Sequence, residues 1–222
     1  MAAAPLSAGA ILLTYLVAQV VAALLSAAGG AVLGHGAVLQ VSFAATPCAV
    51  LGCCLGALVL ARRSGRPCPR LTWPGAIWAG AGLLAGLAVK FAGDLLLRLE
   101  AAVVGPRLRG NNPLVLYPDL FRRPLPLVIL VVALVALVPV AEELFFRGLV
   151  YGWLRARLGP WPASLIGGLL FAVAHGDLSL LPPLWLAGVA LCWLYERSGS
   201  LLPGMAAHAA LNAAAVAFAL VP

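Results

Sequence analysis

Charged residues are scarce in this chain: Asp, Glu, Lys and Arg together make up 9% of 222 residues, while 64% are hydrophobic. A soluble domain carries about 25% charged residues, so this chain lacks the groups that cover a water-facing surface. Long apolar runs recur from end to end, and a bilayer core needs ~20 apolar residues per helix. The composition therefore excludes an ordinary soluble domain and predicts an all-α, polytopic transmembrane bundle.

Lysine is almost missing, since Lys90 is the only one among fourteen basic residues. The arginines lie mostly between apolar runs, where basic side chains anchor helices at lipid headgroups. The net charge of +7 is therefore no sign of a nucleic-acid partner. Together with an excess of Ala, Gly and Leu, the preference for Arg hints at a bacterial gene. We expect an integral protein of the bacterial cytoplasmic (inner) membrane.

The C-x-x-C spacing of zinc and redox sites is also missing, although the chain has five cysteines. Four of them lie in apolar runs, where cysteine behaves as a small hydrophobic residue. Cys68 is the exception, because it lies in an arginine-rich loop and is a candidate free thiol. The cysteines therefore indicate no redox or metal chemistry.

The apolar runs predict seven spans, with an eighth if the segment around Arg147 crosses separately. A glycine-rich turn is expected over residues 29–36 and a polar loop over 105–123. We expect one integral-membrane domain, 1–222, in which spans and loops (1–123) precede the catalytic core spans (124–222). The runs cover residues 8–28, 37–61, 74–104, a segment opening at Pro124, 161–175, 181–195 and 201–221.

The stretch VAEELFFRGL, residues 140–149, places two acids and an arginine inside the fourth run. An acid at bilayer depth costs ~2.5–3.5 kcal/mol, so two adjacent acids need a partner or a task. Glu143 and Arg147 have the favourable i, i+4 order for an ion pair. Glu142 lies about 100° further around the helix and stays available. Bracing of a kink at Pro139 by both acids is the alternative, because proline removes a helix hydrogen bond.

Two histidines and an asparagine are the strongly polar residues of the later runs. His175 ends the stretch FAVAH, and His208 and Asn212 share one helix face in HAALN. Taken singly, each could be an interhelical hydrogen bond. Together with the acids they could form one pocket, in which Glu142 and His175 deprotonate a water. His208 and Asn212 would then supply N–H donors to an oxyanion, which suits hydrolysis of a peptide bond.

Metal-assisted hydrolysis is a second interpretation of the same residues. Glu142, His175 and His208 would make a two-His, one-Glu ligand set with a position left for water. The short motif H-E-x-x-H is missing from the sequence, so no local pattern indicates zinc. We expect no cofactor, with a divalent metal such as zinc as the alternative.

The stretches EELFFR (142–147), FAVAH (171–175) and HAALN (208–212) resemble the CPBP family of intramembrane proteases. This family includes the type II CAAX prenyl endoprotease, and its pattern is E-E-x-x-x-R, F-x-x-x-H and H-x-x-x-N on separate membrane helices. The resemblance covers roughly residues 124–221. It implies a helical fold with a cavity open to one side, and a glutamate-dependent mechanism without metal.

Carried over residue by residue, the resemblance assigns the water-activating role to Glu142 and His175. His208 and Asn212 would stabilise the oxyanion, with Glu143 and Arg147 supporting the site. The implied partners are the lipid bilayer and a membrane-associated peptide or protein substrate.

Two other function classes stay open at this point. The first is a non-catalytic membrane scaffold or immunity protein that retains the fold. The second is a transporter or proton relay, because intramembrane Glu and His often mark ion paths. The paired, interrupted half-helices typical of transporters are missing from the sequence pattern, which counts against the second class.

Overall fold

The computed structural model describes residues 6–33, 38–105 and 122–220, and all regular structure in these ranges is helical. Within them, six helices are long and apolar enough to cross a membrane, and a seventh apolar helix of 15 residues is shorter. The predicted all-α membrane fold is therefore confirmed. The separate helices are α1 (Ala8–Leu33), α2 (Val38–Arg63), α3 (Ala76–Val104), α9 (Pro160–Ala174), α10 (Leu181–Ser198) and α11 (Leu201–Leu220).

The fourth predicted run forms one continuous helical rod of 35 residues, Pro124–Leu158. The eighth span considered for the segment around Arg147 is therefore wrong, because this segment continues the rod. The rod is much longer than a bilayer core requires. Along it follow α6 (Pro124–Val132), the π-helix η2 (Ala133–Leu137), α7 (Val138–Glu142), the π-helix η3 (Glu143–Tyr151) and α8 (Gly152–Leu158).

The wide π-helical turn of η2 lies immediately before Pro139. In this turn the Val138 N–H donates to the Ala133 carbonyl, five residues back instead of four. Proline has no N–H, and its ring clashes with the carbonyl four residues earlier in a regular α-helix. Widening the turn before the proline relieves that clash, and such insertions are frequent at functional sites.

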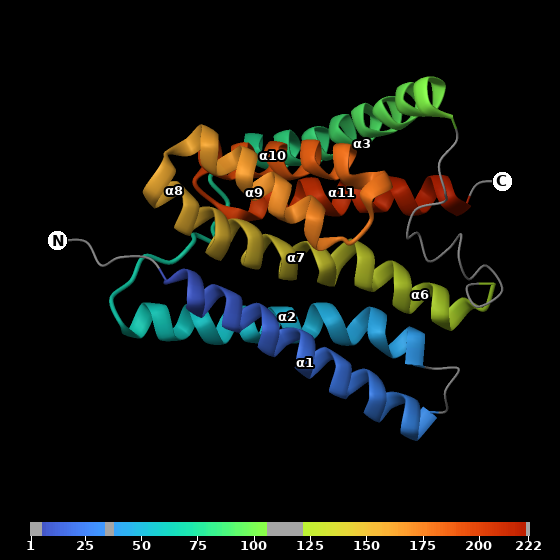
Figure 1. The fold of residues 1–222 in the computed structure, drawn as a ribbon, viewed down its shortest axis with the longest axis horizontal. Coiled ribbons are helices and arrows are strands. Elements are labelled where there is room, and N and C mark those ends of the chain that lie inside the picture. Colours follow the sequence, from blue (N-terminus) through green and yellow to red (C-terminus); the bar gives the residue numbers. More distant parts are fainter. Residues whose placement is uncertain (1–5, 34–37, 106–121, 221–222) are drawn as a thin grey trace.

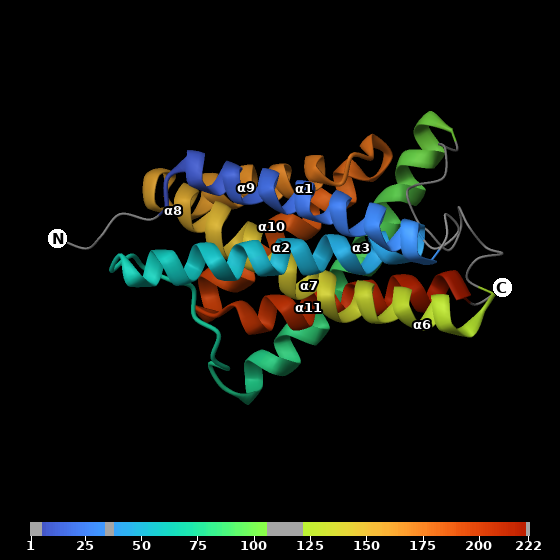
Figure 2. The same ribbon diagram turned by 90° about the horizontal axis from the view of Figure 1, so that it is seen from below.

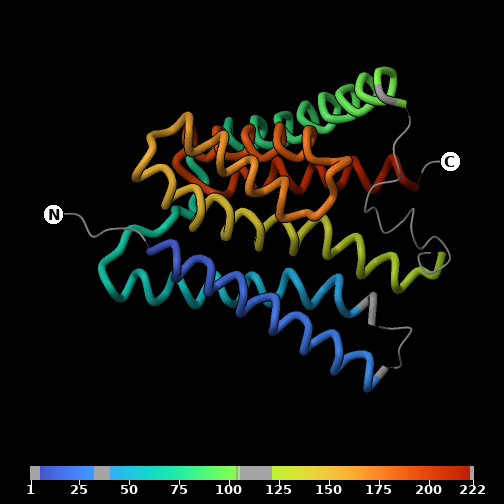
Figure 3. Tube along the Cα trace, in the orientation of Figure 1, coloured from blue at the N-terminus to red at the C-terminus, as the bar shows by residue number. Residues whose placement is uncertain are grey.

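The rod lies between two groups of helices (Figure 1). On one side it packs against α2, which is paired along its length with α1. On the other side η3 contacts α9, α10 and α11, and α3 covers α11 and α10 from outside. The view from below shows α1 and α2 crossing in front of the rod (Figure 2). The Cα trace shows the axes of α1, α2 and the rod running in roughly the same direction (Figure 3).

Small residues allow the close helix crossings that position α11. A Cβ on Gly82 of α3 would lie 2.6 Å from the Pro203 carbonyl oxygen, and one on Gly86 would lie 2.0 Å from that of Ala207. Glycines four residues apart let two membrane helices approach at backbone distance. The next residue after Ala207 is His208, so this crossing fixes the height of a candidate site residue.

The turn expected over residues 29–36 is wrong in its first half. Gly29 and Gly30 lie inside α1, which ends at Leu33. A Cβ on Gly29 would lie 2.7 Å from the side chain of Val41 in α2, so this glycine serves close helix packing. Residues 34–37, and most of the polar loop expected over 105–123, lie outside the described residues.

Candidate active site

Glu142 lies at the centre of the rod, where α7 ends and the π-helix η3 begins. Its side chain borders a cavity of about 460 Å³ between α2, the rod and the end of α9. α2 contributes Thr46 and Val50 to this cavity, and His175 closes it from the end of α9. The Glu142 side chain is 25% exposed, so it is within reach of a molecule in the cavity.

Two imidazoles face the Glu142 carboxylate. Its Oε2 atom lies 4.0 Å from Nε2 of His175 and 3.8 Å from Nε2 of His208. These separations are too long for direct hydrogen bonds. They suit a water molecule that bonds to both sides at ~2.8 Å, because polar groups more than about 3.5 Å apart are commonly bridged by water. The arrangement can therefore hold and deprotonate a water.

His175 has one ring nitrogen fixed by its own helix. Its Nδ1 atom lies 2.8 Å from the Phe171 carbonyl oxygen, one turn earlier in α9. A carbonyl only accepts hydrogen bonds, so Nδ1 carries the proton and Nε2 of the neutral ring is an acceptor. The Phe171 ring packs edge-on against His175 and His208, with centroid distances of 4.7 and 5.8 Å. One buried aromatic side chain thus orients both imidazoles.

Glu143 fixes the second imidazole. The Nδ1 atom of His208 lies 3.1 Å from Oε1 of Glu143, which is completely buried. A carboxylate accepts hydrogen bonds, so Nδ1–H of His208 donates to Glu143 and Nε2 is directed toward Glu142. Gly204, one turn earlier in α11, makes room for this contact, since a Cβ there would lie 3.1 Å from Oε2 of Glu143.

Arg147 completes the buried part of the site. Its Nη1 atom lies 2.9 Å from Oε1 of Glu143, so the i, i+4 ion pair expected from the sequence is present. Nη2 donates to the Gly188 carbonyl of α10 at 3.3 Å, and the guanidinium lies 4.6 Å from the centroid of the Phe171 ring. Arg147 therefore ties the rod to α9 and α10 while neutralising Glu143.

Asn212 lies beside this network and not within it. Its Nδ2 atom donates to the carbonyl oxygen of Leu134, in η2, at 2.8 Å. Of the six residues singled out in the sequence, the structure thus connects five, Glu142 among them, in one network, and directs the sixth to the rod backbone. No motif in the sequence pointed to Leu134 or to Thr46 of the cavity wall. The one available signal for Leu134 was Pro139, five residues later.

A zinc ion does not fit these side chains as they stand. Within the described ranges, no group of three or more His, Cys, Asp or Glu side chains is placed to hold a metal ion. Glu142, His175 and His208 have O–N separations of 3.8 and 4.0 Å. Tetrahedral ligands at ~2.0–2.1 Å from zinc lie only about 3.3 Å apart.

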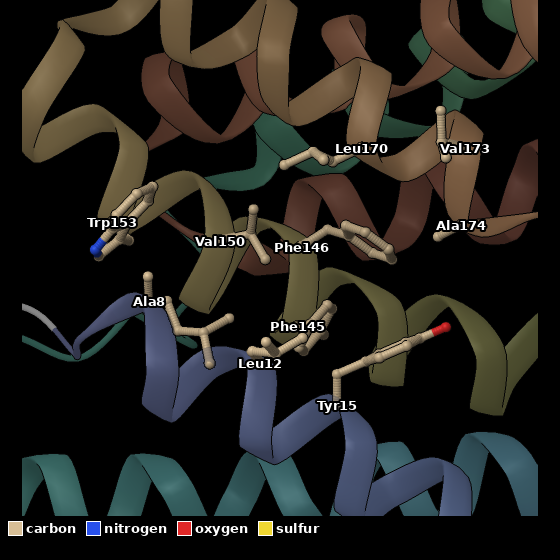
Figure 4. A pocket seen from close by; sticks show the side chains of 11 residues that line it. Ala8, Leu12, Tyr15, Phe145, Phe146, Val150, Trp153, Leu170, Val173 and Ala174 are labelled. Atoms are coloured by element: carbon tan, nitrogen blue, oxygen red, sulfur yellow. The ribbon is translucent and has the colours of Figure 1, made fainter.

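A second cavity, of about 350 Å³, lies between α1, the rod and α9 (Figure 4). Its lining is apolar and aromatic, with Tyr15, Phe145 and Trp153 among the labelled side chains. No carboxylate, imidazole or basic side chain is among the described residues that line it. Phe146 lines it too and packs edge-on against Phe171, with ring centroids 5.2 Å apart. Glu142 and His175, by contrast, line the Glu142 cavity.

Comparisons with known proteins agree with the motifs. Residues 124–214 match the model of the Rce1-like type II CAAX prenyl endopeptidases. The chain is also 27% identical over 146 residues to a Bacillus subtilis (strain 168) protein named "Putative membrane peptidase YdiL". That match covers 66% of this chain and 57% of the relative, a little over half of its length. No solved structure matches the chain.

The resemblance inferred from the three motifs is confirmed by the family match over residues 124–214. Six helices of membrane-spanning length and this similarity together identify an integral membrane protein. The division into N-terminal spans (1–123) and catalytic core spans (124–222) stays a prediction.

Proposed function

We propose that this protein is an intramembrane endopeptidase that uses a Glu142-activated water to hydrolyse a peptide bond. One observation carries the proposal: the Glu142 carboxylate faces the Nε2 atoms of His175 and His208 at 4.0 and 3.8 Å beside a cavity. Similarity to a family of endopeptidases and to a relative named as a membrane peptidase supports the same activity.

The first step of the proposed reaction is the activation of water between Glu142 and His175. The water donates one hydrogen to Oε2 of Glu142 and the other to Nε2 of His175, which leaves a lone pair for attack on the carbonyl carbon. Glu142 takes the proton as the carbon–oxygen bond forms, as a general base does. It then delivers this proton to the leaving amine when the carbon–nitrogen bond breaks.

The negative charge that develops on the carbonyl oxygen needs donors aimed at it. His208 becomes such a donor when its Nε2 is also protonated, and Glu143, 3.1 Å from Nδ1, offsets the charge of the ring. The amide of Asn212 has a second N–H beyond the one bonded to Leu134, and we assign that N–H to the oxyanion. Arg147 and Glu143 act as supporting residues.

The proposed substrate is a membrane-associated peptide or protein, cleaved in an exposed or C-terminal tail segment. The Glu142 cavity is lined mainly by apolar side chains, and Ser42 and Thr46 of α2 add two hydroxyls to its wall. An extended peptide can enter such a cavity, whereas a folded helix is too wide for it. The matched family is described as endopeptidases, which supports peptide cleavage, and the proposed substrate needs no prenyl group.

We further propose that the reaction needs no metal ion and that the protein resides in the bacterial cytoplasmic membrane. Prolonged treatment of the purified protein with EDTA and 1,10-phenanthroline is then expected to leave cleavage within about twofold of the untreated rate. Loss of cleavage that added Zn²⁺ restores would replace this mechanism by a metal-dependent one. Fractionation of cells that express the chain tests the location.

The proposed activity is tested by mapping new protein termini in cells. Wild type and Glu142→Gln are produced at equal levels, and new C-termini in the membrane fraction are identified by mass spectrometry. Termini that appear only with wild type establish proteolysis and reveal the substrate. Identical termini, with both proteins correctly inserted, would overturn the proposal in these cells and favour a non-catalytic membrane partner.

A further inference from the structure

Pro139 leaves one backbone carbonyl of the rod without a donor from its own helix. The carbonyl of Leu134 would accept from Val138 in an α-turn or from residue 139 in a π-turn. The Val138 N–H donates to Ala133, and proline at 139 has no N–H. A carbonyl at membrane depth needs a partner from within the protein, because lipid offers none.

Asn212 supplies that partner from another helix. Its Nδ2 atom lies 2.8 Å from the Leu134 oxygen, and it is one turn after His208 on α11. The same helix therefore holds the rod at two heights. Asn212 holds it at Leu134, eight residues before Glu142, and His208 holds it at Glu143, one residue after Glu142.

We propose that Asn212 is a positioning residue: through the Leu134 carbonyl it holds the wide turn before Pro139, and so fixes Glu142 relative to both imidazoles. This inference rests on the proposed function for its effect on cleavage, and on geometry alone for the hydrogen bond. The positioning role of Asn212 differs from its role as oxyanion donor. In the positioning role, one N–H of the Asn212 amide bonds to the rod backbone, and this bond needs no substrate.

Pro139 offers a matched test, because Pro139→Ala restores the missing N–H. Residue 139 can then bond to Leu134 in a five-residue turn, or the helix can regularise so that Val138 bonds to it. In either case the Leu134 carbonyl is satisfied without Asn212. The positional part of the Asn212→Ala defect should therefore disappear in the Pro139→Ala background.

The experiment measures cleavage of an identified substrate by Asn212→Ala, Pro139→Ala and the double variant in proteoliposomes. In the wild-type background, Asn212→Ala should lower kcat at least about tenfold, equivalent to ~1.4 kcal/mol, with KM changed less than about twofold. In the Pro139→Ala background, the same substitution should lower kcat by a factor at least about threefold smaller, because only the oxyanion N–H is lost there. An equal loss in both backgrounds would overturn the proposal and leave Asn212 acting on the substrate alone.

Hydrogen exchange provides a readout that does not depend on cleavage. In Asn212→Ala, backbone amides over residues 133–142 should exchange at least about tenfold faster than in wild type, and Pro139→Ala should suppress this difference. Unchanged exchange in Asn212→Ala would overturn the proposal even if the proline variant fails to insert. The exchange experiment also distinguishes the two proposals. If exchange is faster in Asn212→Ala and Pro139→Ala suppresses the difference, but no substrate is cleaved, the positioning role is correct and the proposed activity is wrong.

Discussion

Two clusters of charged side chains lie along the rod, and they differ in how their polar atoms are paired. In the cluster near the end of the rod, Arg155 donates to both carboxylate oxygens of Glu196 at 2.9 and 3.0 Å. The Tyr151 hydroxyl donates to the same carboxylate at 2.8 Å. Every charged atom named here has a partner, as expected of a cluster that joins the rod to α10.

The cluster around Glu142 is incompletely paired. Among the described residues, Oε2 of Glu142, Oε2 of Glu143 and Nε of Arg147 are buried without a hydrogen-bond partner in the protein. Buried unpaired polar atoms are costly, and each one in a native structure calls for an explanation, such as a catalytic role or a bound water. The clusters therefore differ: one is a paired, partly exposed ion pair, and the other contains buried polar atoms without a partner, of which only Glu142 belongs to a side chain that borders the cavity.

The largest expected effect comes from removing one of the two imidazoles that face Glu142. His175→Ala should lower kcat by about 10²–10⁴-fold, because a positioned acid–base group contributes a factor of this size. The His175 side chain is 31% exposed, so its removal should leave the unfolding temperature close to that of wild type. Cleavage in proteoliposomes and thermal unfolding in detergent check both results. Retained kcat would show that His175 takes no part in the reaction.

The next effect concerns the buried ion pair of Glu143 and Arg147. This pair should contribute far more to the free energy of unfolding than the partly exposed pair of Arg155 and Glu196. Arg147→Met leaves Glu143 charged and buried, and breaking such a pair costs about 3–5 kcal/mol. Thermal unfolding should show this loss, and Glu143→Gln added to Arg147→Met should recover part of it. A double variant no more stable than Arg147→Met alone would contradict this explanation.

A smaller effect is expected at the cavity wall formed by α2. Thr46→Trp should raise KM about tenfold, because the indole fills space beside Glu142, and should change kcat less. Val59→Trp is the matched control, since Val59 lies on α2 with half of its side chain exposed and away from this cavity. An equal rise of KM in both variants would show that the cavity does not hold the substrate.

The smallest effect belongs to the fully paired cluster. Arg155→Met should lower the free energy of unfolding by no more than about 1 kcal/mol, because ion pairs this exposed contribute little. The side chains of Arg155 and Glu196 are 43% and 28% exposed. Thermal unfolding measured beside Arg147→Met gives the comparison directly. A loss for Arg155→Met as large as that for Arg147→Met would remove the proposed distinction between the clusters.

Local spacing was sufficient to predict the features that depend on one helix. The apolar runs predicted the membrane helices, and the i, i+4 order of Glu143 and Arg147 predicted their ion pair. The predicted turn at Gly29 was wrong because the same residue also serves close packing against Val41. A single sequence does not distinguish a glycine that ends a helix from one that admits a neighbouring helix.

Contacts between helices that are distant in the sequence could not be predicted from the spacing of residues within one helix. Asn212 bonds to a backbone carbonyl, and a carbonyl is present at every residue, so Leu134 had no sequence signature of its own. The wall formed by Thr46 depends on how α2 packs beside the rod, which a run of apolar residues does not encode. The roles proposed for Glu142, His175, His208 and Asn212 in the reaction remain predictions from motif and geometry.

The most direct test of the central claim compares two glutamates in one assay. Purified Glu142→Gln and Glu196→Gln are reconstituted in proteoliposomes with an identified substrate, and both are checked for insertion. Glu142→Gln should lower cleavage by at least about 100-fold, because it removes the general base, while Glu196→Gln should stay within about twofold of wild type. Cleavage by Glu142→Gln at the wild-type rate would contradict the assignment of Glu142 as the residue that activates water.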